Sequence, residues 1–235
     1  MNPETYLAPL RLDLETHSNP NIAPDQARYM RNLFPFYGLE APRRMAIFRE
    51  FIRKNGLPDD QPWQTVVQYM FTLPEREWQY LALEIAKKYR KKWTESDLEL
   101  FETLIVTKSW WDSVDAISSD LVGALLENRA EWAPTAVQRW LASGNMWLQR
   151  TALIYQRKYK SKTNTEILIR SIRYCKSNNA FFIQKAIGWA LRSYSYEDPE
   201  WVKTLIQTEG ITGLAAREAL KAIQRQAQRT DEMPN

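Results

Sequence analysis

The feature that most constrains the fold of this chain is an internal period of 35 residues. Asp115 is followed 35 residues later by Arg150, and Arg150 is followed 35 residues later by Lys185. At each of these steps aromatic residues stand about one helical turn ahead of the charged one. A fixed period of this length is typical of stacked pairs of helices, in which equivalent positions form a ladder along one surface. We therefore expect an acid, a guanidinium and an ammonium on successive rungs.

The composition favours helices over a sheet. The chain has 235 residues and only 7 glycines, and no segment alternates apolar and polar residues for long. We predict an all-α, right-handed solenoid of helical pairs in which residues 1–228 form one domain, with a disordered tail over 229–235. The inner helices should line a concave, basic surface, which solenoids use to bind extended partners.

Caps and prolines predict where the helices begin. Thr72–Glu75, Thr94–Asp97 and Ser109–Asp112 each have the spacing of a capping box, and Asp198-Pro199 opens a later helix. The first 24 residues should form at most a short helix. A helix that starts at Asp25 ends before the turn at 34–38. The other predicted helices cover 43–54, 62–72, 74–92, 95–106, 117–128, 133–142, 145–160, 163–175, 179–194, 199–207 and 211–228.

Other features of the chain bear on its compartment. No apolar run approaches the ~18 residues that a membrane span needs, and the first residues, MNPETYLAPLRLDLE, lack the order of a signal peptide. The single cysteine, Cys175, excludes an internal disulfide and fits a reducing compartment. We expect a monomeric cytoplasmic protein without a membrane partner.

The distribution of charge indicates a phosphate-bearing partner. Between Arg139 and Arg192 there are eleven Lys or Arg and one acid, Glu166, so this basic segment carries +10 and the remainder sums to −6. Basic residues clustered on part of a repeat protein are typical of nucleic-acid binding. The alternative is a solvated cationic face with no ligand.

The chain lacks the residues of several common kinds of active site. Its one histidine, His17, lies in the polar lead, and no Cys or His cluster has metal-ligand spacing. There is neither a dinucleotide-binding nor a nucleotide-binding glycine motif. We expect no metal and no cofactor, so any chemistry must use carboxylate, cations and aromatic faces.

Asp115 is the best single candidate for chemistry. Trp111 precedes it by one turn on the same helical face, whereas the neighbouring Asp112 is accounted for by capping. An Asp here could simply pair with a basic neighbour, and Arg150 on the next rung would hold the carboxylate in place and in its charged form. Trp147 and Trp189 share the ladder with charge, whereas six other tryptophans fit a buried core: Trp63, Trp78, Trp93, Trp132, Trp140 and Trp201.

Five blocks, in order, resemble the AlkD family of bacterial alkylpurine DNA glycosylases, which are built of HEAT-like repeats. They are YMRNLFPFYGLEAPRR at 29–44, LPEREWQYLALEIAKKY at 73–89, SWWDSVD at 109–115, WLQRTALI at 147–154 and FFIQKAIGWALR at 181–192. The resemblance covers nearly the whole chain, from Tyr29 to about Leu205.

This resemblance implies that the protein hydrolyses the N-glycosidic bond of N3- and N7-alkylated purines in duplex DNA, without flipping the base. Asp115 would then be catalytic, with Trp111 and Trp189 embracing the damaged nucleotide. The residues expected to bind DNA are Arg150, Lys185, Trp147, Arg43, Arg44 and Arg192.

Two other classes of function stay open at this point. A non-catalytic HEAT-like protein that binds damaged or branched DNA would explain the basic segment, but not an acid in the middle of it. A protein-protein scaffold would explain neither the basic segment nor the Asp115–Arg150 ladder.

Overall fold

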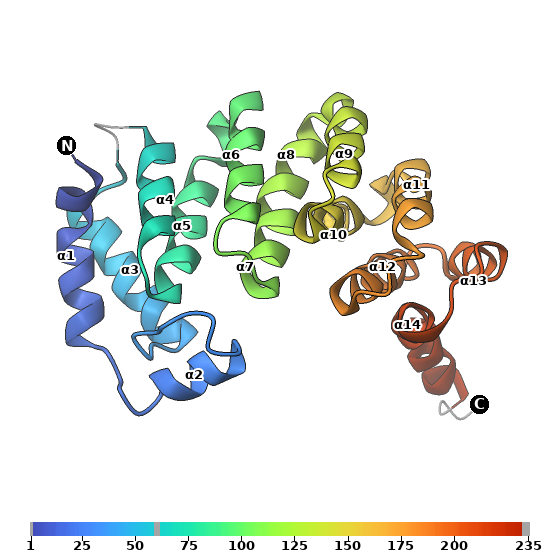
Figure 1. Ribbon diagram of the computed structural model, residues 1–235, viewed down its shortest axis with the longest axis horizontal. Helices are drawn as coiled ribbons and strands as arrows, with labels where there is room; N and C mark the ends of the chain where they lie inside the picture. The colour runs from blue at the N-terminus through green and yellow to red at the C-terminus, as the bar shows by residue number, and fades with distance from the viewer. Residues whose placement is uncertain (1, 59–61, 232–235) are drawn as a thin grey trace. The chain divides into compact units, whose positions relative to one another are not determined.

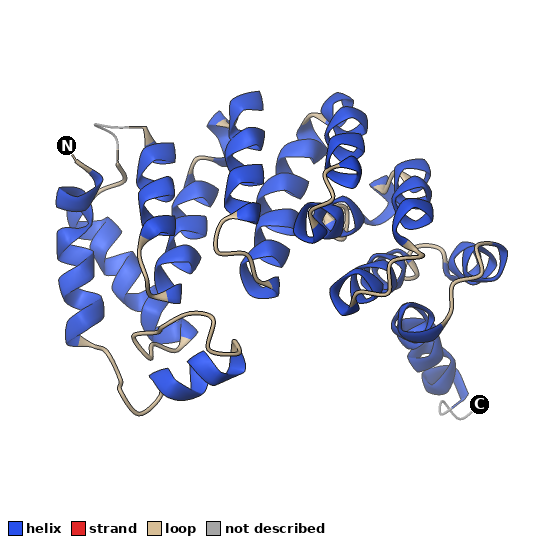
Figure 2. Cartoon of the chain, viewed as in Figure 1, coloured by secondary structure: helices blue, strands red, loops and turns tan. Residues whose placement is uncertain are grey.

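A computed structural model describes residues 2–58 and 62–231. Every regular segment in these residues is helical (Figure 2), which confirms the all-α prediction. Contacts between residues group into two compact units, Met1–Leu100 and Phe101–Asn235. The expectation of one domain over 1–228 stays a prediction.

The first unit contains a longer leading helix than the sequence predicted. Helix α1 spans Pro3–Thr16 because the carboxamide of Asn2 caps it, accepting the amide of Glu4 at 3.0 Å. Tyr6, Leu7, Leu10 and Leu14 are buried along one face of α1, which packs on α3 and α4. The spacing of these four residues is the helical signal that the prolines obscured. The remaining helices of the unit are α2 (Ala23–Tyr29), α3 (Ala41–Asn55), α4 (Trp63–Thr72), α5 (Arg76–Lys88) and the short 3₁₀ turn Arg90–Lys92.

Helix α6 (Glu95–Val106) crosses the boundary between the units, and the second unit continues from it (Figure 1). The capping box at its start is confirmed in one half, because the carboxylate of Asp97 accepts the amide of Thr94 at 2.7 Å. The helices that follow are α7 (Trp111–Ala116), α8 (Gly123–Asn128), α9 (Ala133–Ala142), α10 (Met146–Ile154), α11 (Thr165–Cys175), α12 (Phe181–Tyr194), α13 (Pro199–Thr208) and α14 (Gly213–Asp231).

A π-helical segment, Ile117–Val122, joins α7 to α8. This segment packs against α10, because the hydroxyl oxygens of Ser118 and Thr151 are 2.8 Å apart. At its end, a Cβ at Gly123 would lie 2.4 Å from the carbonyl oxygen of Tyr155, which follows α10. Single π turns inside α-helices occur often at functional sites. This one begins two residues after Asp115.

Several predicted boundaries are wrong for local reasons. Trp110 is the residue that precedes α7, no side chain caps that helix, and the Ser109 hydroxyl donates to the Ile105 carbonyl at 2.7 Å instead. Likewise α5 begins at Arg76 without a side-chain cap. There the Thr72 hydroxyl donates to the Tyr69 carbonyl at 2.7 Å. Both hydroxyls thus bond to a carbonyl of the helix before the predicted start, which competes with capping.

Two helix ends also differ from the prediction. Helix α10 ends at Ile154 rather than at 160, and turns follow it. Helix α14 extends to Asp231, so the tail predicted from Arg229 is helical over its first three residues. The rest of that tail, 232–235, lies outside the described residues.

Helices α12 and α14 of the second unit pack closely together. A Cβ at Gly188 of α12 would lie 2.4 Å from the Cβ of Glu218 and 2.7 Å from the carbonyl oxygen of Ala215, both on α14. Only glycine permits this distance. As a result the acidic residue Glu218 is held against the face of α12 that carries Lys185, Trp189 and Arg192.

Within residues 2–58 and 62–231, no helix combines the length and the apolar character that crossing a membrane requires.

Candidate functional site

The ladder predicted from the 35-residue period brings Asp115 and Arg150 into contact. The guanidinium of Arg150 on α10 grips the carboxylate of Asp115 on α7 through two parallel hydrogen bonds, Nε to Oδ1 at 2.7 Å and Nη2 to Oδ2 at 2.8 Å. Paired bonds of this kind fix the plane and direction of a carboxylate. The Asp115 side chain is 14 % exposed, so the aimed carboxylate remains reachable from solvent.

Arg150 itself is almost fully enclosed, with 1 % of its side chain exposed. Its remaining terminal nitrogen donates to the backbone carbonyl of Phe182 on α12. The guanidinium thus links three helices of the second unit, and its donors are used within the protein. This burial favours a role as the partner of Asp115 over the expected direct contact with DNA.

Trp111 opens α7 one turn before Asp115, and its side chain is partly exposed. Asp112 lies between them in the first turn of the helix, where a negative charge interacts favourably with the helix N-terminus. Since Trp110, and not Ser109, is the residue that precedes the helix, the helix dipole gives a structural reason for an acid at 112 in place of the predicted capping box.

Trp189 is surrounded by cations from two parts of the chain. Its ring centroid lies 4.9 Å from the guanidinium carbon of Arg157, 5.2 Å from that of Arg150, 5.8 Å from Lys185 Nζ and 5.9 Å from the guanidinium carbon of Arg192. Each lies within the range of a cation–π interaction. The indole N–H is buried and makes no hydrogen bond among the described residues.

Glu218, which the sequence analysis did not single out, neutralises part of this charge. Its carboxylate is 4 % exposed and accepts from Lys185 at 2.8 Å, Arg192 at 3.0 Å and Lys221. Burial raises the pKa of Glu218, but the hydrogen bonds from Lys185 and Lys221 outweigh burial and hold the pKa at about 2. Two of the predicted DNA-binding cations, Lys185 and Arg192, are thus positioned by one carboxylate on α14.

Trp147 belongs to an aromatic cluster rather than standing alone on the ladder. Its ring meets Trp110 edge to face at 5.9 Å and Phe182 at 5.0 Å, and Trp110 and Phe182 meet at 5.1 Å. All three side chains are partly exposed. The cluster sits at the first turns of α7, α10 and α12, one turn ahead of the charged rungs, and steadies the helix ends that present them.

Arg43 and Arg44 lie on α3 in the first compact unit. Arg43 is exposed. Arg44 is half-buried, with its guanidinium carbon 4.6 Å from the centroid of Tyr80 and one nitrogen donating to the Leu39 carbonyl at 3.3 Å. Burial lowers the pKa of Arg44. Of the two, Arg43 is the one whose side chain is open to a partner.

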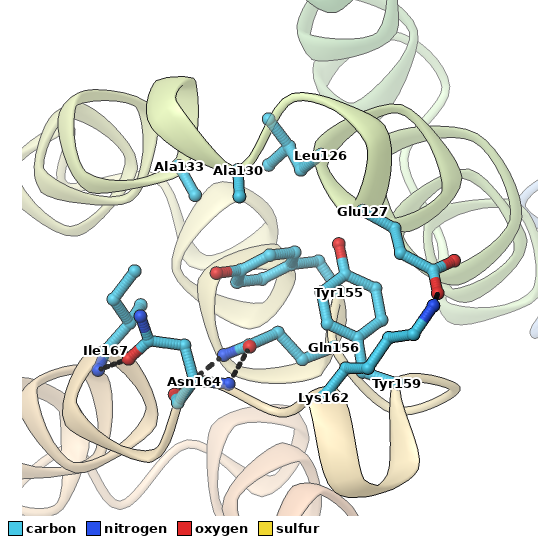
Figure 3. A pocket seen from close by; sticks show the side chains of 10 residues that line it. All are labelled: Leu126, Glu127, Ala130, Ala133, Tyr155, Gln156, Tyr159, Lys162, Asn164 and Ile167. Atoms are coloured by element: carbon cyan, nitrogen blue, oxygen red, sulfur yellow. Dashed lines mark hydrogen bonds and ion pairs between the residues drawn. The ribbon is translucent and has the colours of Figure 1, made fainter.

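A cavity of about 190 Å³ lies elsewhere in the second unit, and Tyr155 and Tyr159 are among the residues that line it (Figure 3). Asn164 and Gln156 bond to each other there, and Lys162 reaches Glu127 at 3.1 Å. The volume is below the roughly 300–1,000 Å³ typical of small-molecule sites. Neither Asp115 nor the ladder tryptophans line it. Among the described residues no three His, Cys, Asp or Glu side chains gather closely enough to hold a metal ion.

One residue missed by the sequence analysis carried a detectable signal. Arg157 and Arg192 are also 35 residues apart, seven residues after Arg150 and Lys185, so they form a second rung of the same ladder. Glu218 carried no such signal, because it lies outside the basic segment and off the period.

Comparison with known proteins agrees with the geometry. The family model described as DNA alkylation repair enzyme matches residues 10–223. The chain belongs to this family. A solved structure titled "Predicted DNA alkylation repair enzyme from Enterococcus faecalis" is similar to it, with 33 % identity and a TM-score of 0.80 over 87 % of this chain and 95 % of that one. No match was found among curated proteins.

Membership of the DNA alkylation repair family confirms the family-level resemblance drawn from the five sequence blocks. The match covers α3 of the first unit as well as the Asp115 site of the second. DNA is therefore the substrate class that the family implies, and the roles of the individual residues remain predictions.

Proposed function

We propose that this protein is a DNA glycosylase that removes positively charged N3- and N7-alkylated purines from duplex DNA. The observation that carries the proposal is the Asp115 carboxylate, which is gripped in two places by the buried Arg150 yet remains 14 % exposed. In a family of DNA alkylation repair enzymes, a fixed and reachable negative charge suits the stabilisation of a cationic transition state.

The main requirement of this reaction is that the protein stabilises positive charge in the transition state. Alkylation at N3 or N7 gives the purine a formal positive charge. When the C1′–N bond breaks, its electron pair passes to the base, which leaves neutral. The positive charge then appears on the deoxyribose. Water bonds to C1′ and loses a proton, giving an abasic site.

Asp115 would stabilise the positive charge on the sugar and orient the attacking water. The partly exposed Trp111 and Trp189 would offer electron-rich rings to the cationic nucleotide. Arg150 would act through Asp115 by holding it. Since the leaving base is already charged, no general acid is required, which agrees with a chain whose only histidine is His17. The proposal includes excision without base flipping, as the resemblance implies.

Lys185 and Arg192 would contact the DNA backbone near the lesion, and the exposed Arg43 would contribute from the first unit. The expected setting is a monomer in the cytoplasm.

The test is release of N7-methylguanine from a duplex that contains one such base, measured by chromatography under single-turnover conditions against a no-protein control for spontaneous depurination. Release well above the control supports the proposal. Selective binding of the lesion duplex without release would instead support the alternative, a non-catalytic protein that recognises damaged or branched DNA.

A further inference from the structure

Arg157 is the one cation of the group around Trp189 that no protein carboxylate pairs. Arg150 is bonded to Asp115, and Lys185 and Arg192 are bonded to Glu218. The guanidinium of Arg157 makes no side-chain hydrogen bond or ion pair within the described residues, and its Nε is buried without an acceptor. It lies 4.9 Å from the Trp189 centroid.

An unpaired, partly buried guanidinium, with Nε enclosed and without an acceptor, is energetically unfavourable. Burial lowers the pKa of Arg157, attraction by Asp115 opposes this, and repulsion from Arg150 and Arg192 adds to it. Arginine nevertheless stays charged at neutral pH. A buried charge without a partner costs free energy that a bound anion would recover. The charge of the surroundings also favours an anion. Among the described residues, the cations Arg150, Arg157, Lys185, Arg192 and Lys221 outnumber the carboxylates of Asp115 and Glu218, and the nearby Asp120 is itself paired with Lys158.

The Trp189 ring gives this guanidinium a defined place. Stacking on an aromatic face restrains the planar group while leaving its N–H donors free at the edges. A planar fork of donors matches two oxygens of a phosphodiester. Arg192, which Glu218 fixes beside the same ring and which repels Arg157, adds a second positive charge near Arg157.

We propose that Arg157 binds one backbone phosphate of the DNA strand that carries the lesion. This rests on the proposed function, which supplies the DNA. A phosphate on Arg157 would lie within the electrostatic reach of Asp115, so its own deoxyribose, or the next one, would be placed against the carboxylate. Arg157 is then a positioning residue, because it acts by placing the sugar.

The experiment pairs a change in the protein with a change in the DNA. The probes are duplexes with a stable tetrahydrofuran abasic analogue, in which single phosphodiesters on the analogue strand are replaced, one at a time, by uncharged methylphosphonates. Affinities are measured by fluorescence anisotropy for the parent, Arg157→Gln and Arg170→Gln. Arg170 is an exposed arginine of the same basic segment, so its replacement changes net charge equally.

With the parent protein, neutralising one linkage beside the analogue should weaken binding about tenfold, the size expected for a charge-assisted contact. Arg157→Gln should bind the intact duplex about tenfold more weakly and should no longer respond to that linkage. Arg170→Gln should keep the parent's response. If the loss of affinity caused by Arg157→Gln simply adds to the loss caused by the methylphosphonate at every linkage, Arg157 contacts none of these phosphates and the assignment is wrong.

Arg157→Lys serves as a second variant if the glutamine protein is unstable. It keeps the charge but not the fork, so it should retain only part of the response to the neutral linkage. If both the Arg157→Lys and the Arg157→Gln proteins lose as much affinity as the parent when that linkage is neutralised, the proposal is wrong.

The same proteins are assayed for release of N7-methylguanine. No release by the parent, with the linkage response intact, would refute the glycosylase proposal and leave the phosphate site standing. Release by the parent, with additive losses throughout, would refute the phosphate site alone.

Discussion

At the scale of single residues, the charges of Asp115 and Arg150 have different roles: the Asp115 carboxylate is open to a substrate, and the Arg150 guanidinium holds that carboxylate in place. Asp115 is reachable, whereas Arg150 is 1 % exposed and has its donors occupied by Asp115 and Phe182. The two residues are therefore expected to respond differently to substitution. Loss of Arg150 should release the carboxylate and leave a buried gap, whereas loss of the Asp115 charge should leave the packing nearly intact.

Asp115→Asn should lose most excision of N7-methylguanine, since the replacement has nearly the same shape but cannot stabilise a developing cation. Binding of undamaged duplex should hold or tighten, because a negative charge leaves a cationic site. Single-turnover rates and anisotropy check both points, with rates compared at a temperature where both proteins are folded. Asp112→Asn is the matched control on the same helix. It should keep excision and lose about 0.3–1 kcal/mol of stability from the helix dipole. A D115N protein as fast as the parent would remove Asp115 from the mechanism.

Trp189 tests the part played by the aromatic face. Trp189→Phe should retain more excision of N3-methyladenine than Trp189→Leu, because phenylalanine keeps a ring that interacts with cations and leucine keeps only apolar area. Rates are measured at matched fraction folded. Uracil should be a poor substrate for the parent and both variants, since a neutral base needs a general acid. Rapid release of uracil would contradict this mechanism. Equal excision rates for the two variants would show that the aromatic ring at 189 does not contribute to catalysis.

At the scale of elements, α14 is as important to the site as the ladder helices. Gly188 lets α14 approach α12 so closely that Glu218 lies against Lys185 and Arg192. The π-helical segment after α7 plays a comparable part for Asp115, because it lies against α10, which carries Arg150. The site is thus assembled by close helix–helix contacts.

Glu218→Gln should destabilise the protein at pH 7 by an amount between the ~1 kcal/mol of an exposed pair and the roughly 3–5 kcal/mol of a buried one. The pKa of Glu218 is held at about 2, below its ordinary value of 4.5. The stabilisation is therefore present above pH 4.5 and is lost as the pH falls toward 2. Thermal melts across this range should show the difference between parent and variant shrinking. Glu200→Gln, which removes an exposed pair with Lys203, should change little. A difference that is constant down to pH 2 would contradict the assignment of charge to Glu218.

At the scale of the whole molecule, charge is the property that links the chain to its substrate. The basic segment between Arg139 and Arg192 carries +10, and the rest of the chain is acidic overall. Several of these cations are held beside Trp189. Binding of DNA should therefore depend on the release of counterions from phosphates.

The affinity for undamaged duplex should fall steeply with salt, and Arg192→Gln should make the slope of log affinity against log salt shallower by about one. Lys91→Gln, in the first unit and outside the basic segment, should leave the slope unchanged. Anisotropy titrations between low and moderate salt measure both. The same slope for Arg192→Gln and the parent would show that Arg192 serves only as a partner of Glu218.

Periodicity and composition determined the all-α fold and the meeting of Asp115 with Arg150, because equivalent positions of stacked helical pairs fall on one line whatever the loops do. The family resemblance came from the five sequence blocks. The caps at Ser109 and Thr72 could not be settled this way, since their hydroxyls had a competing acceptor in the preceding helix. Only the tertiary structure decided that Arg150 is buried, that Glu218 from α14 neutralises Lys185 and Arg192, and that Arg157 is left unpaired. These outcomes depend on how closely α10, α12 and α14 approach one another. That distance is set by contacts between distant residues, such as Gly188 with α14, and a local sequence pattern does not predict it.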